Sequence, residues 1–542
     1  MRERFQDLKP LLDIGSDGVR MIGILGMGGC GKTTLASSVY MDISKHFQGH
    51  CFIENVREKT RWYGLKSVQK EILTALFKKK TEAIRYDGYS YDHDHDHSSH
   101  FSEIVSKMKK LRLLSKAVCC DSDANASGPN FLSNELRYIH WESYPASPFP
   151  QSFQLMKLVV LKLWGSMQKE VWKGYKQLPC LKVLQLKYMW ELLNTPDLEG
   201  LHRLQKLTLS SCKELEEIHQ SLGNHKYLEY VSVSECPKLR MFPDIIHMEN
   251  LKTLEIKDCF LKDGEIPSGI GELSNLEELS LCGNDFSRLD FHISQLTRLK
   301  VLNLSNCVKL LELPELPSNS SILKADYCNS LTTVGDCHIN CRQLCNVSLM
   351  GGGIINDGGK LLQSMLKGNV IDNGPILLRL KGLDVLKEFT PLLRGRRCRL
   401  QLPENWGNDH CGFLICAVLP NYFHWGDPER IIIRHVTSGM DFEDDVVWEE
   451  SDGDGDKHTF VYYISFASMR DAIWWGKTYK ALEFNIEDYR CCGFGVRLVS
   501  KRSRNAQTET STYSSGYTSR LEIVDNLESA LTVSLSFDDK LP

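Results

Sequence analysis

The chain has 542 residues, of which 42% are hydrophobic and 25% charged, and its formal net charge is −4. This composition excludes a disordered or fibrous protein, and the length predicts several packed domains. The negative net charge argues against a nucleic-acid binder, because such proteins usually carry an excess of lysine and arginine.

The N-terminal stretch MRERFQDLKP lacks the apolar core of a secretion signal, and no window of the sequence is apolar over the length of a membrane span. The 19 cysteines are not spaced like a compact disulfide framework. We therefore expect reduced thiols and an intracellular location, cytoplasmic or nuclear.

A phosphate-binding motif lies at residues 26–33. The segment VRMIGILG before it predicts a strand, and residues 33–43 after it predict a helix. Between them, GMGGCGKT fits the pattern GxxxxGK[ST], in which backbone N–H groups surround the phosphates, the lysine neutralises them and the hydroxyl ligates Mg²⁺. The predicted nucleotide-binding residues are Gly26, Gly28, Gly29, Gly31, Lys32, Thr33 and Thr34, with Thr33 as the Mg²⁺ ligand.

An apolar run at residues 51–56 and helical periodicity at 65–77 continue this pattern, so residues 1–80 are predicted to be a partial P-loop α/β domain. Hydrolysis needs a later acidic residue that holds Mg²⁺. Residues 60–130 contain no apolar strand ending in paired aspartates. We expect binding of ADP or ATP and no enzymatic activity, with a working P-loop NTPase as the alternative.

Residues 81–131 are predicted to be a linker with a degenerate first repeat near residues 108–114. Within the linker, YDGYSYDHDHDHSSH (86–100) is polar and of low complexity. Its alternating Asp and His residues could hold a metal ion loosely, but a solvated linker is favoured.

An internal repeat fills residues 132–330. The first leucine of the pattern LxxLxL recurs every 22 to 25 residues, and a Cys or Asn often follows at a fixed position. This combination is typical of leucine-rich repeats, whose stacked strands form a curved parallel sheet. The leucines are Leu136, Leu158, Leu181, Leu204, Leu228, Leu251, Leu276 and Leu299, and the Cys/Asn positions are Cys212, Cys236, Cys259, Asn284 and Cys307.

Residues between the leucines should face outward, because side chains alternate along a strand. Any one of them could be merely solvated, but solenoids commonly bind partners on this surface as a whole. Trp164 is the best hot-spot candidate, since tryptophan is enriched at such positions. The predicted partner-binding residues are Lys162, Trp164, Gln185, Lys187, Glu255, Lys257 and Asn303.

The repeat period is lost after residue 330. Residues 331–396 are predicted to be a connecting segment with a helix at 361–366, and residues 502–542 a tail rich in Ser and Thr. Between them, alternating apolar segments separated by turns predict an antiparallel β-sandwich or jelly roll at 397–501. The predicted strands are 399–402, 412–419, 431–434, 460–466 and 495–499.

Several motifs together resemble one family. LLDIGSDGVRMIGILGMGGCGKTTLA and FQGHCFIENVRE are similar to the opening of the NB-ARC domain of plant intracellular immune receptors, especially those with an N-terminal Toll-like (TIR) domain. LSNELRYIHWESYP and TPDLEGLHRLQKLTLSSC resemble the repeats of that class. LQLPENW, GFLICAVL and CCGFGVRLV resemble its post-repeat jelly-roll domain, called C-JID.

The resemblance implies a receptor that holds ADP at rest, exchanges it for ATP and recognises a pathogen effector or host protein through the repeats and the C-terminal domain. It places Val19 and Arg20 near the adenine. The TIR domain, the second acidic motif, the GLPLA segment and the MHD-type His-Asp are missing, which implies a truncated relative without NAD cleavage. Two alternatives stay open: a protein-binding scaffold without nucleotide, and an extracellular repeat receptor, which GEIPSGIGELSNL (264–276) resembles.

Overall fold

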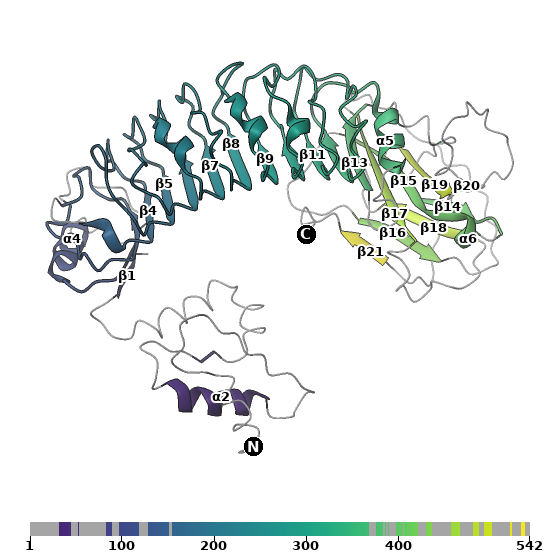
Figure 1. Ribbon diagram of the computed structural model, residues 1–542. Coiled ribbons are helices and arrows are strands. Elements are labelled where there is room, and N and C mark those ends of the chain that lie inside the picture. Colours follow the sequence, from purple (N-terminus) through teal and green to yellow (C-terminus); the bar gives the residue numbers. More distant parts are fainter. Residues whose placement is uncertain are drawn as a thin grey trace. The chain divides into compact units, whose positions relative to one another are not determined.

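The computed structural model forms two compact units (Figure 1). The first contains Met1–Cys120, Pro129–Trp141 and Pro150–Leu158, and the second contains the remaining residues. The structure describes residues 32–44, 52–53, 83–88, 97–118, 128–150, 154–367, 376–382, 385, 389, 397–404, 406–420, 430–435, 457–466, 481–486, 491, 493–500, 521–522 and 533–536.

In the first unit, the helix predicted after the phosphate-binding loop is confirmed as α2 (Lys32–Ile43). Strands β1 (Ala83–Gly88), β2 (Leu113–Val118) and β3 (Tyr138–Glu142) pair in parallel. Helix α4 (His97–Lys107) connects β1 to β2 along the chain, and a short helix, η2, spans Leu155–Lys157. Part of the predicted linker is therefore regular structure. The expected strand at 51–56 is described only at Phe52–Ile53, which are not in a strand, and the helix expected at 65–77 lies outside the described residues.

In the second unit, each repeat contributes one short strand to a parallel sheet, which follows the inner side of an arc (Figure 1). Its leucines stack in register, as in the pairing of Leu161 with Leu184 and of Leu184 with Leu207. All eight predicted leucines of the array, of which Leu136 and Leu158 belong to the first unit, are at most 1% exposed, which confirms the repeat pattern. The strands are β4 (Val160–Trp164), β5 (Val183–Lys187), β6 (Lys206–Ser210), β7 (Tyr230–Ser234), β8 (Thr253–Lys257), β9 (Glu278–Ser280), β10 (Val301–Asn303) and β11 (Ile322–Lys324). The outer side carries the short helices η3 (Gln220–Asn224), η4 (Ser268–Glu272) and η5 (Ile293–Gln295).

The parallel sheet does not stop at residue 330. β12 (Asn346–Leu349) and β13 (Ile376–Lys381) extend it beyond β11, and α5 (Gly358–Lys367) connects them where a helix was predicted. The LxxLxL spacing fades here because the connection between β12 and β13 is longer and contains α5. Strand pairing therefore continues through residues that the sequence pattern assigned to a connecting segment.

The Cys/Asn position turns inward after each strand and hydrogen-bonds to neighbouring backbone. Asn284 Nδ2 donates to the carbonyls of Ile256 and Leu281, each at 2.8 Å, and Asn284 Oδ1 accepts from the N–H of Leu261 at 3.1 Å. At the equivalent position, the Sγ of Cys307 lies 3.3 Å from the carbonyl of Leu281. These contacts confirm the inward orientation predicted from the spacing, and a thiol performs the same task with weaker hydrogen bonds.

The residue just before the Cys/Asn position adopts a left-handed backbone conformation in most repeats. Its φ lies between 52° and 68° at Gly165, Tyr188, Ser211, Glu235, Asp258, Gly283, Asn306 and Tyr327. This conformation turns the chain sharply out of the strand, and a side chain in it costs about 1–2 kcal/mol relative to glycine. The sharp turn therefore forms in each of these repeats, whatever the residue type at this position.

The C-terminal part consists of antiparallel strands. β17 (Lys457–Ser465) pairs with β13, β15 (His410–Pro420) pairs with β17, and β19 (Gly493–Ser500) pairs with β15. A second sheet has the order β20-β14-β18-β16-β21. Its strands are β14 (Arg397–Gln401), β16 (Arg430–His435), β18 (Ala481–Ile486), β20 (Leu521–Glu522) and β21 (Val533–Ser536), and a short helix, α6, spans Trp406–Asp409.

All five predicted C-terminal segments are strands, namely β14, β15, β16, β17 and β19. β18 was missed, although ALEFNI has the alternation of a strand, with large apolar residues at Leu482, Phe484 and Ile486. β20 and β21 lie within the segment that was predicted to be a tail.

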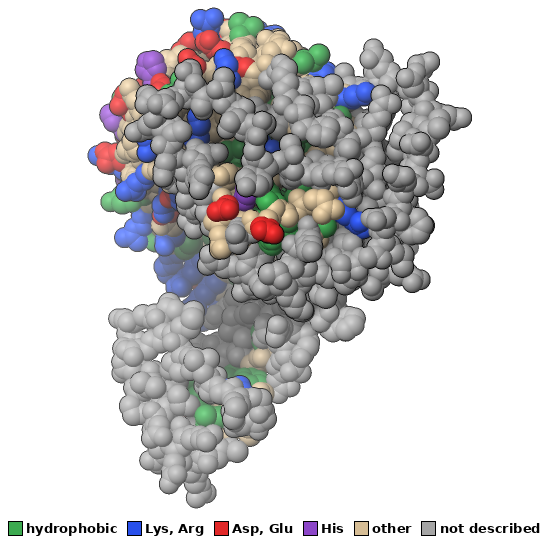
Figure 2. All heavy atoms as spheres, turned by 90° about the vertical axis from the view of Figure 1, so that its right-hand side faces the viewer, with side chains coloured by type: hydrophobic (Ala, Val, Ile, Leu, Met, Phe, Trp, Pro, Cys, Tyr) green, Lys and Arg blue, Asp and Glu red, His purple; other side chains and the backbone are tan. Residues whose placement is uncertain are grey.

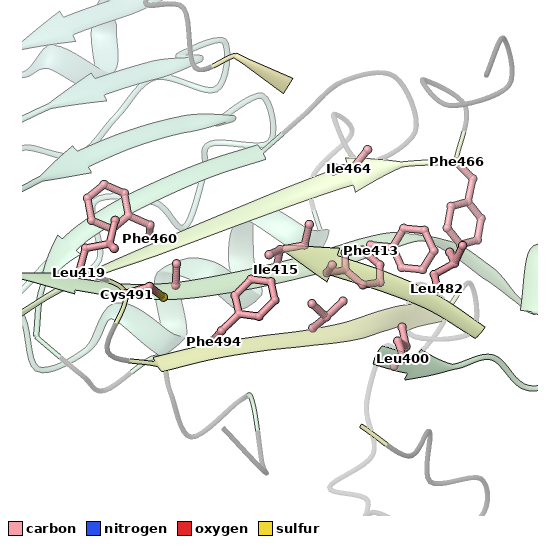
Figure 3. Close-up of a cluster of buried hydrophobic side chains, with 13 residues drawn as sticks. Leu400, Phe413, Ile415, Leu419, Phe460, Ile464, Phe466, Leu482, Cys491 and Phe494 are labelled. Atoms are coloured by element: carbon pink, nitrogen blue, oxygen red, sulfur yellow. The ribbon is translucent and has the colours of Figure 1, made fainter. Parts of the chain in front are cut away.

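Both groups of antiparallel strands contribute to one buried cluster (Figure 3). Phe413 of β15 is 0% exposed, and its ring centroid lies 5.2 Å from that of Phe484 on β18 and 5.0 Å from that of Phe466. Leu400 of β14 and Phe494 of β19 belong to the same cluster. The strands that continue the repeat sheet and the strands of the second sheet therefore share a hydrophobic core.

Exposed ion pairs join successive repeats in the segments between the strands. Examples are Lys238–Glu214 at 2.5 Å, Lys252–Glu229 at 2.9 Å and Lys300–Glu277 at 2.7 Å, all between exposed side chains of successive repeats. Positive (blue) and negative (red) side chains are accordingly interspersed over the coloured surface in Figure 2. Such exposed pairs each contribute at most about 1 kcal/mol. Among the described residues, no helix is long and apolar enough to cross a bilayer.

Candidate functional site

The outward-facing side chains of the repeat sheet form three rows, because the strands pair in register. The first row runs Val160, Val183, Lys206, Tyr230, Thr253, Glu278, Val301 and Ile322. The second runs Lys162, Gln185, Thr208, Ser232, Glu255, Ser280, Asn303 and Lys324. The third runs Trp164, Lys187, Ser210, Ser234 and Lys257.

The seven predicted partner-binding residues all occupy the second and third rows and are half-buried. The structure therefore places them on one continuous surface, and their part in binding stays a prediction. None of the predicted partner-binding residues lies in the first row. Lys206 and Tyr230 in that row pack against each other, with the lysine Nζ 3.9 Å from the ring centroid.

At the β4–β6 end, cationic side chains lie close together. The Nζ of Lys187 lies 5.1 Å from the ring centroid of Trp164, a cation–π geometry. Burial lowers the pKa of Lys162, and the nearby charges of Lys187 and Lys206 lower it further. This part of the sheet therefore has a positive potential, to which an anionic group would be attracted.

In the middle of the sheet, small hydroxyls and one compact polar cluster replace the long cations. Ser234 Oγ donates to Ser210 Oγ at 3.0 Å. Tyr230 Oη donates to Glu255 at 2.9 Å, and Lys257 Nζ donates to the same carboxylate at 2.7 Å. Burial would raise the pKa of Glu255, but the hydrogen bonds that it accepts outweigh this and lower the pKa. The cluster holds Glu255 ionised and fixed in position.

The predicted nucleotide-binding residues are only partly described. Lys32 begins helix α2, and Thr33 and Thr34 are exposed in its first turn. A helix N-terminus with these residue types suits phosphate, because its free N–H groups and dipole favour negative charge. Lys32, Thr33 and Thr34 thus fit the predicted site. The other members, Val19, Arg20, Gly26, Gly28, Gly29 and Gly31, lie outside the described residues.

The cysteines serve packing. The side chains of thirteen cysteines are described, and none of these is in a disulfide. Burial raises the pKa of Cys307 and of Cys328 to about 12, so both thiols stay protonated near neutral pH. Within the described ranges, His, Cys, Asp and Glu form no group that could hold a metal ion. The residues brought together on the described sheet are suited to contact with another surface.

Comparison with known proteins agrees with the phosphate-binding motif and with the repeats described above. Residues 4–112 match the family model of the NB-ARC domain. The chain is 32% identical over 219 residues to the disease resistance protein RPP2A of Arabidopsis thaliana, an alignment that covers 40% of this chain and 16% of that protein. It is 27% identical over 264 residues to the TMV resistance protein N of Nicotiana glutinosa, covering 48% of this chain and 22% of that protein.

A third relative, the disease resistance-like protein CSA1 of Arabidopsis thaliana, is 34% identical over 195 residues, covering 35% of this chain and 16% of that protein. The chain thus spans about a fifth or less of the length of these relatives. Among solved structures, the leucine-rich repeat domain of the type III effector XopL aligns with 39% of this chain and 67% of that chain, at 21% identity and a TM-score of 0.31. Residues 4–112 thus match the NB-ARC domain, and the chain, which carries leucine-rich repeats behind that match, is similar over 35–48% of its length to plant disease resistance proteins.

Proposed function

We propose that the chain acts in plant innate immunity by recognising a pathogen effector or a host protein on the outward rows of its repeat sheet. The observation that carries this proposal is the Trp164–Lys187 pair, which places an aromatic anchor and a cation at one end of a continuous parallel sheet. Solenoids use such extended surfaces for partners, and tryptophan is enriched among residues that dominate binding energy.

We further propose that the NB-ARC segment binds ADP or ATP, with Lys32 on the phosphates and Thr33 on Mg²⁺. The start of α2 at Lys32 supports this assignment. Since residues 60–130 contain no apolar strand that ends in paired aspartates for Mg²⁺, the chain acts by binding rather than by turnover. The C-terminal strands then form a β-sandwich beside the repeats, as in C-JID, and the protein works in the cytoplasm or nucleus.

Trp164→Ala should weaken partner binding by about 2 kcal/mol or more, roughly thirtyfold in Kd, because truncation removes the aromatic surface and the contact with Lys187. The measurement is biolayer interferometry of the full chain against a panel of purified effector proteins. Tyr227→Ala is the matched control, since Tyr227 is an exposed aromatic in the loop before β7 rather than on the sheet. Equal affinities of the Trp164→Ala variant and the parent chain for every bound effector would contradict recognition at this surface.

Lys32→Ala should weaken ADP binding by the full chain roughly 10- to 100-fold, the range for hydrogen bonds to charged groups. Alanine favours helix, so α2 should persist and the loss can be assigned to the phosphate contact. Isothermal titration calorimetry measures the affinity. Thr33→Ala is the companion variant, and its defect should be present with Mg²⁺ and absent with EDTA. If the parent chain does not bind ADP or ATP, the protein is a scaffold without a nucleotide.

A further inference from the structure

On the first three strands of the second unit, β4 to β6, the outward-facing charged side chains are all positive. The nine outward positions of β4, β5 and β6 contain three lysines and no carboxylate: Val160, Lys162, Trp164, Val183, Gln185, Lys187, Lys206, Thr208 and Ser210. Glu142, which comes earlier in the chain, lies next to these positions, because the N–H of the next residue, Ser143, donates to the carbonyl of Trp164. From β8 onward the charges are mixed, with Glu255 bonded to Lys257 and with Glu278 on β9.

The three lysines are close enough to repel one another. Lys162 has a lowered pKa because of burial first and then of the charges of Lys187 and Lys206. Within the described part of the chain, Lys187 and Lys206 form no ion pair, and each lies over an aromatic ring instead. Three neighbouring strands of five residues, at the usual rise per residue and the usual distance between strands, give the surface patch that carries these lysines a size of about 13 Å by 10 Å. Its mutual repulsion would be relieved by an anionic group placed on it.

Exposed aromatic side chains border the patch. Tyr188 and Trp190, just after β5, are 46% and 43% exposed, and their ring centroids are 5.9 Å apart. The N–H of Trp190 donates to the carbonyl of Ser166, which follows Trp164 by two residues, so the aromatic pair lies at the same strand ends as Trp164. Tyr188 has a φ of 53°, the left-handed conformation that the adjacent repeat fills with Gly165. A bulky side chain there is uncommon and turns an aromatic ring outward.

We propose that this basic and aromatic patch on β4–β6 binds an acidic polypeptide segment that also carries apolar side chains. The segment's carboxylates would lie over Lys162, Lys187 and Lys206, and its apolar groups would contact Trp164, Tyr188 and Trp190. A polypeptide suits the patch better than a nucleic acid does, because Glu255 and Glu278 lie farther along the same surface and would repel a continuing phosphate backbone. This inference rests on the proposed function and specifies the chemistry of the partner.

The test uses the full chain and fluorescein-labelled probes in fluorescence anisotropy. The probes are a short peptide of glutamates flanking two leucines, the same peptide with lysines in place of glutamates, and a single-stranded DNA of matched charge. The acidic peptide should bind and the lysine peptide should not, and added salt should weaken binding. The double variant Lys187→Glu/Lys206→Glu should reduce the affinity for the acidic peptide by at least about tenfold, and Lys187→Gln/Lys206→Gln by a smaller factor.

The matched control is Lys169→Glu/Lys173→Glu, which makes the same change in charge at exposed positions in the loop after β4. It should leave the affinity within about twofold of the parent, since both positions lie outside the outward rows. Failure of the acidic peptide to bind, or equal affinity of the Lys187→Glu/Lys206→Glu variant and the parent, would overturn the proposal. DNA binding as tight as peptide binding would overturn the assignment to a polypeptide.

Two outcomes with an effector protein separate this inference from the proposed function. If Trp164→Ala loses the effector and Lys187→Glu/Lys206→Glu keeps it, the sheet recognises a partner but the partner is not held by its acidic groups. If neither variant affects binding of an effector that the parent binds, recognition by this surface is itself wrong.

Discussion

Asn284→Ala is expected to destabilise the middle of the repeat array by about 2–4 kcal/mol. The side chain is 0% exposed, donates to the carbonyls of Ile256 and Leu281, and accepts from the N–H of Leu261. Alanine removes these three hydrogen bonds and a longer one to the carbonyl of Cys282, and it leaves buried backbone groups without this partner, which is more costly than losing a solvent-exposed contact. Hydrogen exchange measured by mass spectrometry should show faster exchange in β8, β9 and β10.

The chain offers a matched control for this substitution. Asn284→Cys introduces the residue that adjacent repeats already use at Cys259 and Cys307, and it should cost about half as much as alanine or less, since a thiol fills the space and donates weakly. Strands β14 and β18 should exchange at unchanged rates in both variants. An alanine variant as stable as the parent chain would mean that the hydrogen bonds of Asn284 do not hold the turn.

Phe413→Ala is expected to cost about 3–5 kcal/mol in the C-terminal part, the range for a buried phenylalanine. The ring is 0% exposed and packs against the rings of Phe466 and Phe484, so its removal leaves a cavity in the cluster of Figure 3. Because Phe484 belongs to β18 in the second sheet, hydrogen exchange should accelerate in β14 and β18 as well as in β15. Strands β5–β8 should be unaffected, since stability in repeat proteins is largely local.

Leu414→Ala is the control for the shared core. Leu414 is equally buried but, as the next residue of β15, it points to the opposite face of the strand and is not part of the cluster. Its truncation should destabilise β15 and β17 and leave exchange in β14 and β18 nearly unchanged. Equally fast exchange in β14 and β18 in both variants would mean that truncation on either face of β15 destabilises the second sheet. The effect would then not be specific to the cluster around Phe413.

Part of the candidate site could be predicted from the sequence, and part could not. Lys162, Trp164, Lys187 and the other residues of the second and third rows could be predicted, because side-chain alternation within a strand needs only the local sequence. Lys206 and Tyr230 were overlooked because they stand two residues after the first leucine of LxxLxL, at the start of the strand, where the strand boundary is ambiguous. The ring contact between them requires the register of two strands.

The sequence by itself determined the leucine-rich repeats, since one short pattern recurs and each copy folds in contact with its neighbours. It also determined the buried Cys/Asn position, the helix α2 that begins at Lys32, and five of the C-terminal strands. Only the tertiary structure decided that the parallel sheet continues through β12 and β13, that β17 then pairs antiparallel with β13, and that both groups of C-terminal strands bury one cluster around Phe413. The physical reason is that these features depend on pairing between residues far apart in the chain, such as Leu378 with Val461, and no local period records such pairing.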